Sequence, residues 1–582
     1  MKRKQFAAIF MCAAMTMGLL SACGSTGSEA GSVSSDAKAS ADAPASGDSA
    51  GSLSADSTQK SESGDTAMIV NKSADGYDLN LADFAGSWVY NADYDCYALE
   101  NIVYCEKPLV TSLQSMNIYV PSAYMNEDGS INKEANINGY TAETAPIIYK
   151  NDVAGYMEAS PVSISDSEKE YMEAGFIYVS VGARGRATQL ADGTYVGKSP
   201  YGLIDLKAGV RFLKHNDDVL AGSSDRIISV GTSAGGALSS LLGITGNSSN
   251  YDSYLEEAGA IMDESDEIYA AQCYCPITDL ENADKAYEWE YQADSEYLGF
   301  LSPGGSLTDF QQALSKKLAD EYVDYYNSLN LVDFDGNSLH LDSARSGSGY
   351  EFVKSQLEAA AGKYLTKLEN GELDADYSVE DYLSGNYSYE EMDFASGKAI
   401  EKEGHVYSDF LEWDGENATL TDFDKYVTSY NRRLKTCTAF DDLDLAQAEN
   451  QEMGSETVDV VHFSDDIAPL IADLKEDFPE EYDSYYEAYA TLSDNEDLTQ
   501  KLYLLNPMNY LGTDEECDTA PYFRIRVGTF DPHTAVTVSM NLALKIAQTT
   551  DADVDYATVW DQPHGEADYA GEFTSWVEDI TK

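Results

Sequence analysis

The chain has 582 residues, which is enough for several domains or for one large domain with an insertion. It carries 102 acidic against 36 basic residues, a formal net charge of −66 and a pI of about 4.1. Such a surface repels nucleic acid and anionic lipid, so the sequence excludes a nucleic-acid-binding protein. The acidic residues are spread along the chain, which indicates a solvated exterior and identifies no substrate.

Residues 1–23 have the pattern of an export signal. A basic run at 2–4 precedes an apolar run at 6–20 that is too short to span a bilayer. The segment ends in Leu20-Ser-Ala-Cys23, which resembles the lipobox of bacterial lipoproteins. The resemblance implies cleavage before Cys23, lipidation of its thiol and anchoring to the bacterial cell membrane outside the cytoplasm. The alternative is an ordinary secretory signal with a chance cysteine.

Residues 24–67 consist almost entirely of Ser, Ala, Gly, Asp, Thr and Glu and show no apolar period. We predict a disordered tether that holds the folded part on the order of 35 Å from its anchor.

Six cysteines remain after the lipidation site. Export would permit disulfides, and Cys96 with Cys105 could close a small loop. No Cys-x-x-Cys pair and no Cys/His cluster in the sequence indicates zinc, so we expect neither a metal nor a cofactor.

Strand and helix patterns alternate from residue 68 to about 290. The strands are expected at 113–120, 146–149, 176–181, 227–230 and 268–274, and a helix at 203–215. This alternation predicts an α/β fold with a mostly parallel sheet and helices on both faces. Strands at 522–527 and 554–560, with a helix at 535–548 between them, continue the sheet.

The alternation stops between 291 and 501, in a segment rich in Tyr, Asp and Glu. Ser306-Leu-Thr-Asp309 predicts a capping box at the start of an amphipathic helix. Residues 332–337 superficially resemble a calcium loop, but they lack the distal Glu, so we predict a hairpin turn. We interpret the whole segment as an inserted cap (lid) domain over the carboxyl edge of the sheet, with core parts at 68–290 and 502–582.

Ser233 lies in Gly231-Thr-Ser-Ala-Gly235, between the strand at 227–230 and a helical pattern. In that setting a G-x-S-x-G turn pushes the serine out above the sheet, at a helix N-terminus that favours negative charge. We therefore predict a nucleophilic Ser233. The alternative is a glycine-rich turn without catalytic function.

Asp531 and His564 follow the last two predicted strands, in the Ser–Asp–His chain order of α/β-hydrolases. A serine hydroxyl needs an adjacent base, and that base needs a carboxylate to orient it. The alternatives are a turn-capping aspartate and a surface histidine. The oxyanion requires two backbone donors. We expect them from Ala234, which follows the serine, and from Gly155 in an early loop.

Several segments spread over residues 90–580 match one family in order: 101–104 with 116–121, 145–156, 182–186, 231–236, 274–277 with 287–289, 439–444, 506–507 and 560–564. Together they resemble the bacterial tannases (tannin acyl hydrolases), capped α/β-hydrolases that cleave galloyl esters. The resemblance implies a triad of Ser233, Asp531 and His564, and oxyanion amides at Gly155 and Ala234.

The resemblance also implies acyl-binding residues. A Lys and a Glu of the family's cap reach galloyl hydroxyls, and they fall on Lys435 and Glu449; a plain salt bridge is the alternative. Two residues after the triad aspartate the family has a second Asp, where this chain has His533. Imidazole titrates near pH 6.5. We therefore expect a weaker gallate preference and a loss of activity on gallate esters at acid pH.

These observations predict a surface-anchored serine esterase for small aromatic, polyhydroxylated acyl esters, most of all gallate esters. One alternative is a feruloyl-type or general carboxylesterase. A serine peptidase is a further one, although no propeller-like repeat precedes the hydrolase half. A non-catalytic surface binding lipoprotein would share the signal and tether, but it would have no reason to keep a triad.

Overall fold

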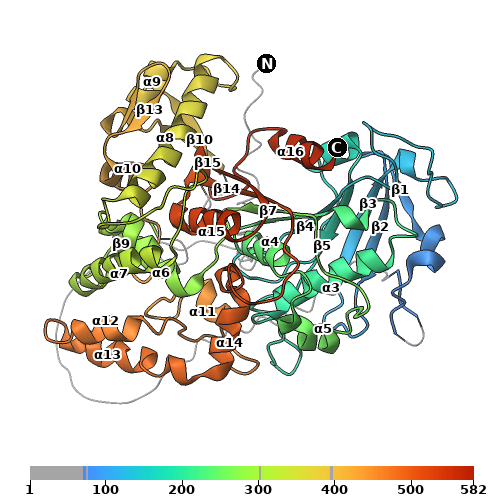
Figure 1. Cartoon of the computed structure of the whole chain (residues 1–582), viewed down its shortest axis with the longest axis horizontal. Coiled ribbons are helices and arrows are strands. Elements are labelled where there is room, and N and C mark those ends of the chain that lie inside the picture. The colour runs from blue at the N-terminus through green and yellow to red at the C-terminus, as the bar shows by residue number, and fades with distance from the viewer. Residues whose placement is uncertain (1–69, 74–75, 300–302, 394–397) are drawn as a thin grey trace, which may run out of the picture.

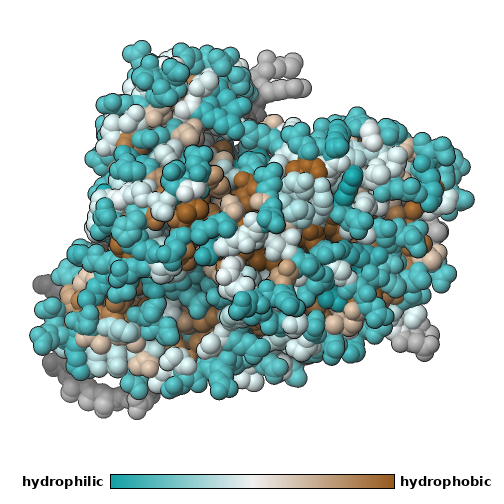
Figure 2. Space-filling model, in the orientation of Figure 1, coloured by the Kyte–Doolittle hydropathy of each residue, from teal (hydrophilic) through white to brown (hydrophobic). Residues whose placement is uncertain are grey.

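The computed structural model describes residues 70–73, 76–299, 303–393 and 398–582. The predicted export signal, the lipidation site Cys23 and the tether at 24–67 lie outside these residues. Hydrophilic residues cover most of the face shown in Figure 2, in keeping with the large negative charge.

The molecule is built around a twisted nine-stranded sheet with the order β1-β2-β3-β5-β4-β6-β7-β14-β15 (Figure 1). Its strands are β1 (Val89–Asn91), β2 (Cys96–Val103), β3 (Ser115–Pro121), β4 (Ile147–Asn151), β5 (Ile177–Val181), β6 (Ile227–Thr232), β7 (Ala270–Tyr274), β14 (Tyr522–Phe530) and β15 (Asp553–Pro563). The strands from β5 to β15 pair in parallel, whereas β1, β2 and β3 add an antiparallel edge. The predicted mostly parallel sheet is confirmed.

Helices cover both faces of the sheet. Successive side chains of a strand point to opposite faces, and β4 shows what each face meets. The Tyr149 hydroxyl donates to the Leu206 carbonyl of α3 (Tyr201–His215), whereas Lys150 pairs with Glu168 at the start of α2 (Lys169–Ala174). The other core helices are α4 (Ala234–Ile244), α5 (Asp252–Ala258), α6 (Leu280–Tyr291), α15 (Val536–Thr549) and α16 (Glu572–Thr581).

The segment between α6 and β14 is mainly helical and lies at the β15 side of the sheet (Figure 1). Its helices are α7 (Asp309–Ser328), α8 (Ser348–Glu369), α9 (Val379–Ser384), α10 (Phe423–Ser429), α11 (Ala448–Glu452), α12 (Ile467–Asp473), α13 (Pro479–Tyr489) and α14 (Glu496–Leu505). Short two-stranded sheets pair β8 (Glu296–Tyr297) with β9 (Gly305–Ser306), β10 (Ser388–Asp393) with β11 (Lys398–Glu403), and β12 (Leu411–Trp413) with β13 (Ala418–Leu420). The predicted limits of this segment, 291 and 501, fall within α6 and α14.

Local predictions in this segment meet different outcomes. The capping box of α7 is formed by Thr308 and Gln311, not by residues 306–309, because Ser306 is already paired in β9. The turn at 332–337 is a hairpin: Val332 pairs with Ser338, and the Asp333 carboxylate accepts the backbone amides of the turn itself.

Cys96 and Cys105 are both buried and both free, so the small disulfide loop that the sequence allowed is not formed. In the part of the chain that the structure describes, no helix is both long and apolar enough to cross a bilayer.

Candidate active site

Ser233 lies in a sharp turn between β6 and α4. Its backbone has φ 62° and ψ −122°, a strained conformation for a residue with a side chain, and α4 begins at the next residue. Glycine is required beside it, because a Cβ on Gly231 would lie 2.2 Å from the Gly235 carbonyl oxygen. The predicted strand, turn and helix are all present around Ser233.

The expected oxyanion donors are the amides of Gly155, in the loop after β4, and of Ala234, at the start of α4. Neither the Gly155 N–H nor the Ala234 N–H donates a hydrogen bond to any residue that the structure describes. The Gly235 amide donates to the Val153 carbonyl at 3.0 Å and thereby holds the loop of Gly155 against the turn of Ser233. Unsatisfied amides are costly unless a ligand or water meets them. The predicted oxyanion donors therefore lie in adjacent loops with their hydrogen bonds unused.

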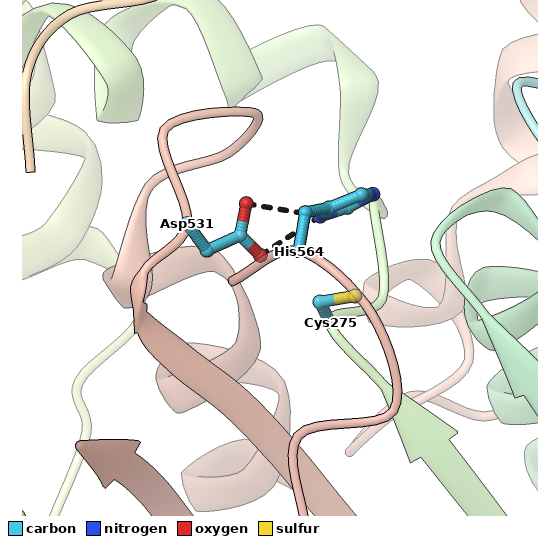
Figure 3. Close-up of side chains that lie close together, drawn as sticks. All are labelled: Cys275, Asp531 and His564. Atoms are coloured by element: carbon cyan, nitrogen blue, oxygen red, sulfur yellow. Dashed lines mark hydrogen bonds and ion pairs between the residues drawn. The ribbon is translucent and has the colours of Figure 1, made fainter. Parts of the chain in front are cut away.

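Asp531, which is buried, and His564, which is partly buried, form a pair at the carboxyl ends of β14 and β15. His564 Nδ1 lies 2.8 Å and 2.9 Å from the two carboxylate oxygens of Asp531 (Figure 3). Burial lowers the pKa of His564, but the Asp531 charge and hydrogen bond outweigh it and hold this pKa well above 6.5. A strong base held by a carboxylate is what a serine nucleophile requires.

The loop that follows His564 is anchored twice to the sheet. Glu566 lies 3.0 Å from the buried Lys150 ammonium on β4. The two carboxylate oxygens of Asp568 accept hydrogen bonds from Nη1 and Nη2 of Arg524 on β14, at 2.7 Å and 2.6 Å. This bidentate geometry gives a strong ion pair. These contacts fix the position of the His564 backbone.

The segment 274–277, after β7, connects the serine turn to the histidine. The Ser233 amide donates to the Tyr274 carbonyl at 2.9 Å, and the Ile277 amide donates to the Ser233 carbonyl at 3.3 Å. Between them, Cys275 places its Sγ within 4.8 Å of ligating atoms of Asp531 and His564. The sequence motif at 274–277 marked this segment, but it gave no sign that the thiol meets the pair.

Lys435 and Glu449 are brought together as buried charges. Only 5% of Lys435 and 4% of Glu449 is exposed, and the Lys435 ammonium lies 3.7 Å from the centre of the Phe440 ring. Burial lowers the pKa of Lys435, and the Glu449 charge opposes this. Among the described residues the two side chains form no ion pair, and Glu449 Oε2 is buried without a hydrogen-bond partner. A plain salt bridge therefore does not account for them.

His533 stacks on the ring of His564, with ring centres 4.4 Å apart and planes inclined by 24°. Burial, then the neighbouring His564 and Lys435, lower the pKa of His533 well below 6.5. A His533 pKa in this direction moves the expected acid-side loss of activity to a pH below 6.5, and the loss itself stays a prediction. That expectation took the pKa of a solvated imidazole, whereas this ring is partly buried and close to His564 and Lys435.

Arg186 is a further residue of the site whose role the sequence did not reveal. Its Nε donates to the Gly155 carbonyl and its backbone amide to the Tyr156 carbonyl, each at 2.7 Å. The guanidinium also contacts the Gln451 side chain on α11, the short helix that carries Glu449. The motif at 182–186 was visible in the sequence, but its partners lie in two distant segments.

The mostly parallel sheet with helices on both faces is that of an α/β-hydrolase. The family model BD-FAE, from an α/β-hydrolase family, matches residues 153–332 and supports an esterase. Tannin acyl hydrolase from Lactobacillus plantarum is 30% identical, with a TM-score of 0.68 over 84% of this chain and 94% of that one. The tannase of Fusobacterium nucleatum is 30% identical, with a TM-score of 0.67 over 84% and 95% of the two chains. The chain therefore belongs to the tannase family, the tannin acyl hydrolases.

A tannin acyl hydrolase in complex with ethyl gallate is likewise 30% identical, with a TM-score of 0.68 over 84% of this chain and 94% of its own. No curated protein matches the chain.

Proposed function

We propose that this protein is a serine esterase that hydrolyses galloyl and related hydroxylated aromatic acyl esters. The observation that carries the proposal is the pair of amides at Gly155 and Ala234. They belong to the two loops that the Gly235–Val153 hydrogen bond joins, and they donate to no described residue. Donors held ready for an oxygen anion suit acyl transfer, in which negative charge develops on the carbonyl oxygen.

The reaction follows from the roles of these groups. His564 accepts the Ser233 proton as the hydroxyl oxygen attacks the ester carbonyl, and Asp531 orients and stabilises the imidazolium. The Gly155 and Ala234 amides donate to the resulting oxyanion. His564 then protonates the leaving alcohol, and an acyl-enzyme remains on Ser233. Water, deprotonated by His564, attacks that ester and releases the carboxylic acid.

The acyl group is inferred from Lys435 and Glu449. A buried carboxylate oxygen without a partner accepts a phenol hydroxyl, and a buried ammonium donates to a second one. Such a site rejects an acyl group that lacks these hydroxyls, because its own polar groups then stay unpaired. A neighbouring Phe440 ring adds an apolar wall. A related tannin acyl hydrolase in complex with ethyl gallate supports a galloyl group as the acyl part of the substrate.

A feruloyl-type esterase is the second candidate. The match of residues 153–332 to BD-FAE, a feruloyl esterase-like domain, favours it. His533 favours it as well, since a neutral imidazole offers one acceptor where a carboxylate would offer several. A hydroxycinnamoyl ring has fewer hydroxyls to satisfy than a galloyl ring.

We also propose that the segment that carries Lys435 and Glu449 acts as a lid over the acyl group. A further proposal is that lipidated Cys23 anchors the protein to the cell membrane, on the side facing away from the cytoplasm. Phase partition in detergent tests the anchor: Cys23→Ala should move the protein from the detergent phase to the aqueous phase.

Hydrolysis of a set of esters tests the proposed function. The set compares a short aliphatic ester with three methyl esters of aromatic acids, methyl gallate, methyl protocatechuate and methyl ferulate, under identical conditions. The proposal expects the highest kcat/KM on gallate or protocatechuate. A preference for ferulate would assign the second candidate. Absence of hydrolysis of every ester, together with no labelling by a fluorophosphonate serine probe, would rule out both.

A further inference from the structure

Cys275 occupies an unusual position beside the Asp531–His564 pair. It follows β7 with φ 35°, a backbone conformation that side chains rarely adopt, and its amide donates to the Arg526 carbonyl at 2.7 Å. Its thiol is fully buried and lies 3.5 Å from the Gly565 carbonyl, in the residue after His564. The strand end therefore holds a thiol against the histidine loop.

Three chemically different ligand atoms meet at this point (Figure 3). The Cys275 sulfur, one imidazole nitrogen of His564 and one carboxylate oxygen of Asp531 all lie within 4.8 Å of one another. Sulfur, nitrogen and oxygen donors are those that zinc accepts, at about 2.3, 2.1 and 2.0 Å. Tetrahedral ligands at such lengths lie roughly 3.5 Å apart. Small side-chain movements bring the three atoms to that spacing.

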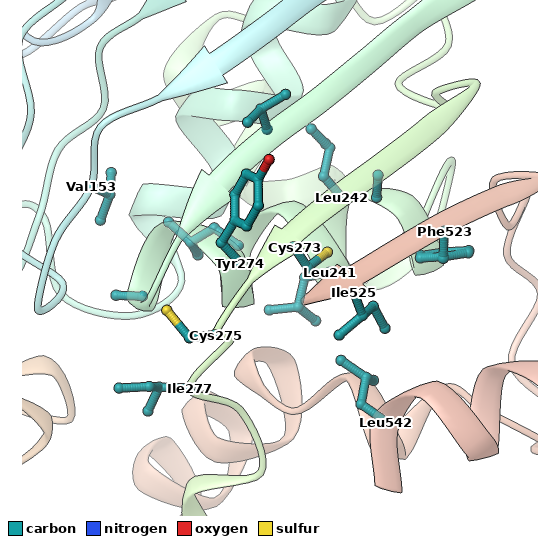
Figure 4. Close-up of a cluster of buried hydrophobic side chains, with 14 of the residues drawn as sticks. Val153, Leu241, Leu242, Cys273, Tyr274, Cys275, Ile277, Phe523, Ile525 and Leu542 are labelled. Carbon is teal, nitrogen blue, oxygen red and sulfur yellow. The ribbon is translucent and has the colours of Figure 1, made fainter. Parts of the chain in front are cut away.

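Position along the strand distinguishes Cys275 from its neighbour. Cys273 lies among the core side chains of α4 and β14, near Leu241 and Ile525, whereas Cys275 lies beyond the strand end (Figure 4). Among the described residues, Cys275, Asp531 and His564 are the one set of three His, Cys, Asp or Glu side chains spaced to hold a metal ion.

We propose that Cys275, Asp531 and His564 form a binding site for Zn²⁺ or another thiophilic divalent cation, and that a cation bound there switches the enzyme off. On binding through Nδ1, the thiol proton passes to solvent and the Nδ1 proton of the neutral His564 imidazole moves to Nε2. Bonds from the metal to sulfur, nitrogen and oxygen form, and no electron is transferred. His564 then has no lone pair oriented by Asp531 for the Ser233 proton, so acylation stops. A water molecule completes the coordination.

Zinc titration of esterase activity is the first test. ZnCl₂ is added to the wild-type protein, to Cys275→Ser and to Cys517→Ser, in buffer free of thiols and chelators. Cys517 is a partly exposed free thiol outside the cluster and serves as the matched control. Cys275→Ser should require at least about tenfold more zinc for half-inhibition. Loss of a residue that hydrogen-bonds a metal ligand already lowers metal affinity about tenfold or more, and loss of the ligand itself should lower it at least as much. Cys517→Ser should behave as wild type.

Cobalt binding gives a second test that does not depend on any activity. Co²⁺ is added to Ser233→Ala protein, and thiolate-to-cobalt absorption in the near ultraviolet is recorded with and without Cys275→Ser. We expect the band in Ser233→Ala and its loss in the double variant; Cys275→Ala replaces Cys275→Ser if the latter does not fold. Equal zinc inhibition of wild type and Cys275→Ser, or no Cys275-dependent cobalt band, would overturn the proposal. If the protein proved to have no esterase activity, the cobalt experiment would still test the metal site, because it measures absorption and not hydrolysis.

Discussion

Arg186 donates a hydrogen bond from Nε to the carbonyl oxygen of Gly155 at 2.7 Å, in a loop where Gly155 and Tyr156 both have positive φ. Glycine adopts positive φ readily, but Tyr156 must be held in this conformation by surrounding contacts. Because the same guanidinium contacts Gln451 on α11, one side chain joins the loop of Gly155, the proposed oxyanion donor, to the helix that carries Glu449.

Arg186→Lys should lower kcat about 10- to 100-fold with little change in KM, less than the 10²- to 10³-fold cost of deleting an oxyanion donor outright. Lysine keeps the charge but loses the planar donors, so the Gly155 amide is no longer held in position. Steady-state kinetics on methyl gallate, with thermal unfolding to check the fold, measures this. Gln451→Leu is the control, since it leaves the Arg186–Gly155 bond intact and should cost less. Equal kcat in wild type and Arg186→Lys would contradict the role.

Ser233→Ala should reduce kcat by about 10⁴- to 10⁶-fold while the protein stays folded. The change removes the nucleophile and leaves the Asp531–His564 pair untouched. Single-turnover hydrolysis and circular dichroism check the two parts. A variant that kept a tenth of the wild-type activity would show that Ser233 is not the nucleophile.

The pH profile should reflect the raised pKa of His564. Only the neutral imidazole accepts the Ser233 proton, so kcat/KM falls as the pH drops through this pKa. Because Asp531 holds the pKa well above 6.5, the acid limb should lie above pH 6.5 in the free enzyme. Asp531→Asn removes the charge that raises the pKa, so the residual activity should have its acid limb at lower pH. The profile is best measured on a non-phenolic ester, and an unmoved limb would contradict the assignment.

His533→Asp should raise kcat/KM for methyl gallate about 3- to 30-fold, if one acceptor contact of about 1 to 2 kcal/mol is gained. A carboxylate can accept hydrogen bonds from several phenol hydroxyls, whereas a neutral imidazole has one acceptor nitrogen. His533→Asn separates the loss of ring stacking on His564 from the gain of charge. A clear fall in gallate activity in His533→Asp, with the fold intact, would show that this position serves another acyl group.

Glu449→Gln should weaken hydrolysis of hydroxylated aromatic esters about 10- to 100-fold more than that of a short aliphatic ester, since a charged hydrogen bond is worth roughly 1.5 to 3 kcal/mol. Glu452→Gln, at the next turn of α11, is the matched control. Burial raises the pKa of Glu452 well above 4.5 and so favours its neutral form, which glutamine resembles. Equal losses on both substrates would count against an acyl-binding Glu449.

How far the sequence predicted the site depends on how local each signal is. Ser233 was predictable because its glycines, strand and helix are neighbours in the chain, and Asp531 and His564 because each follows a strand with a turn signal. The roles of Cys275 and Arg186 were not, because both arise where segments far apart in the sequence meet. His533 shows a third case: its position was marked, but burial against His564 and Lys435 changed its expected titration.

The two anchors of the histidine loop have a consequence for how this enzyme can change. Lys150 and Arg524, which hold Glu566 and Asp568, belong to strands of the central sheet. Lys435 and Glu449 belong to the long segment between α6 and β14. Under the proposed function, substitutions in that segment would change which acyl group is bound, while the His564 imidazole stays where the sheet holds it. The substrate preference of this enzyme could therefore change without any change in the residues that position His564 for proton transfer.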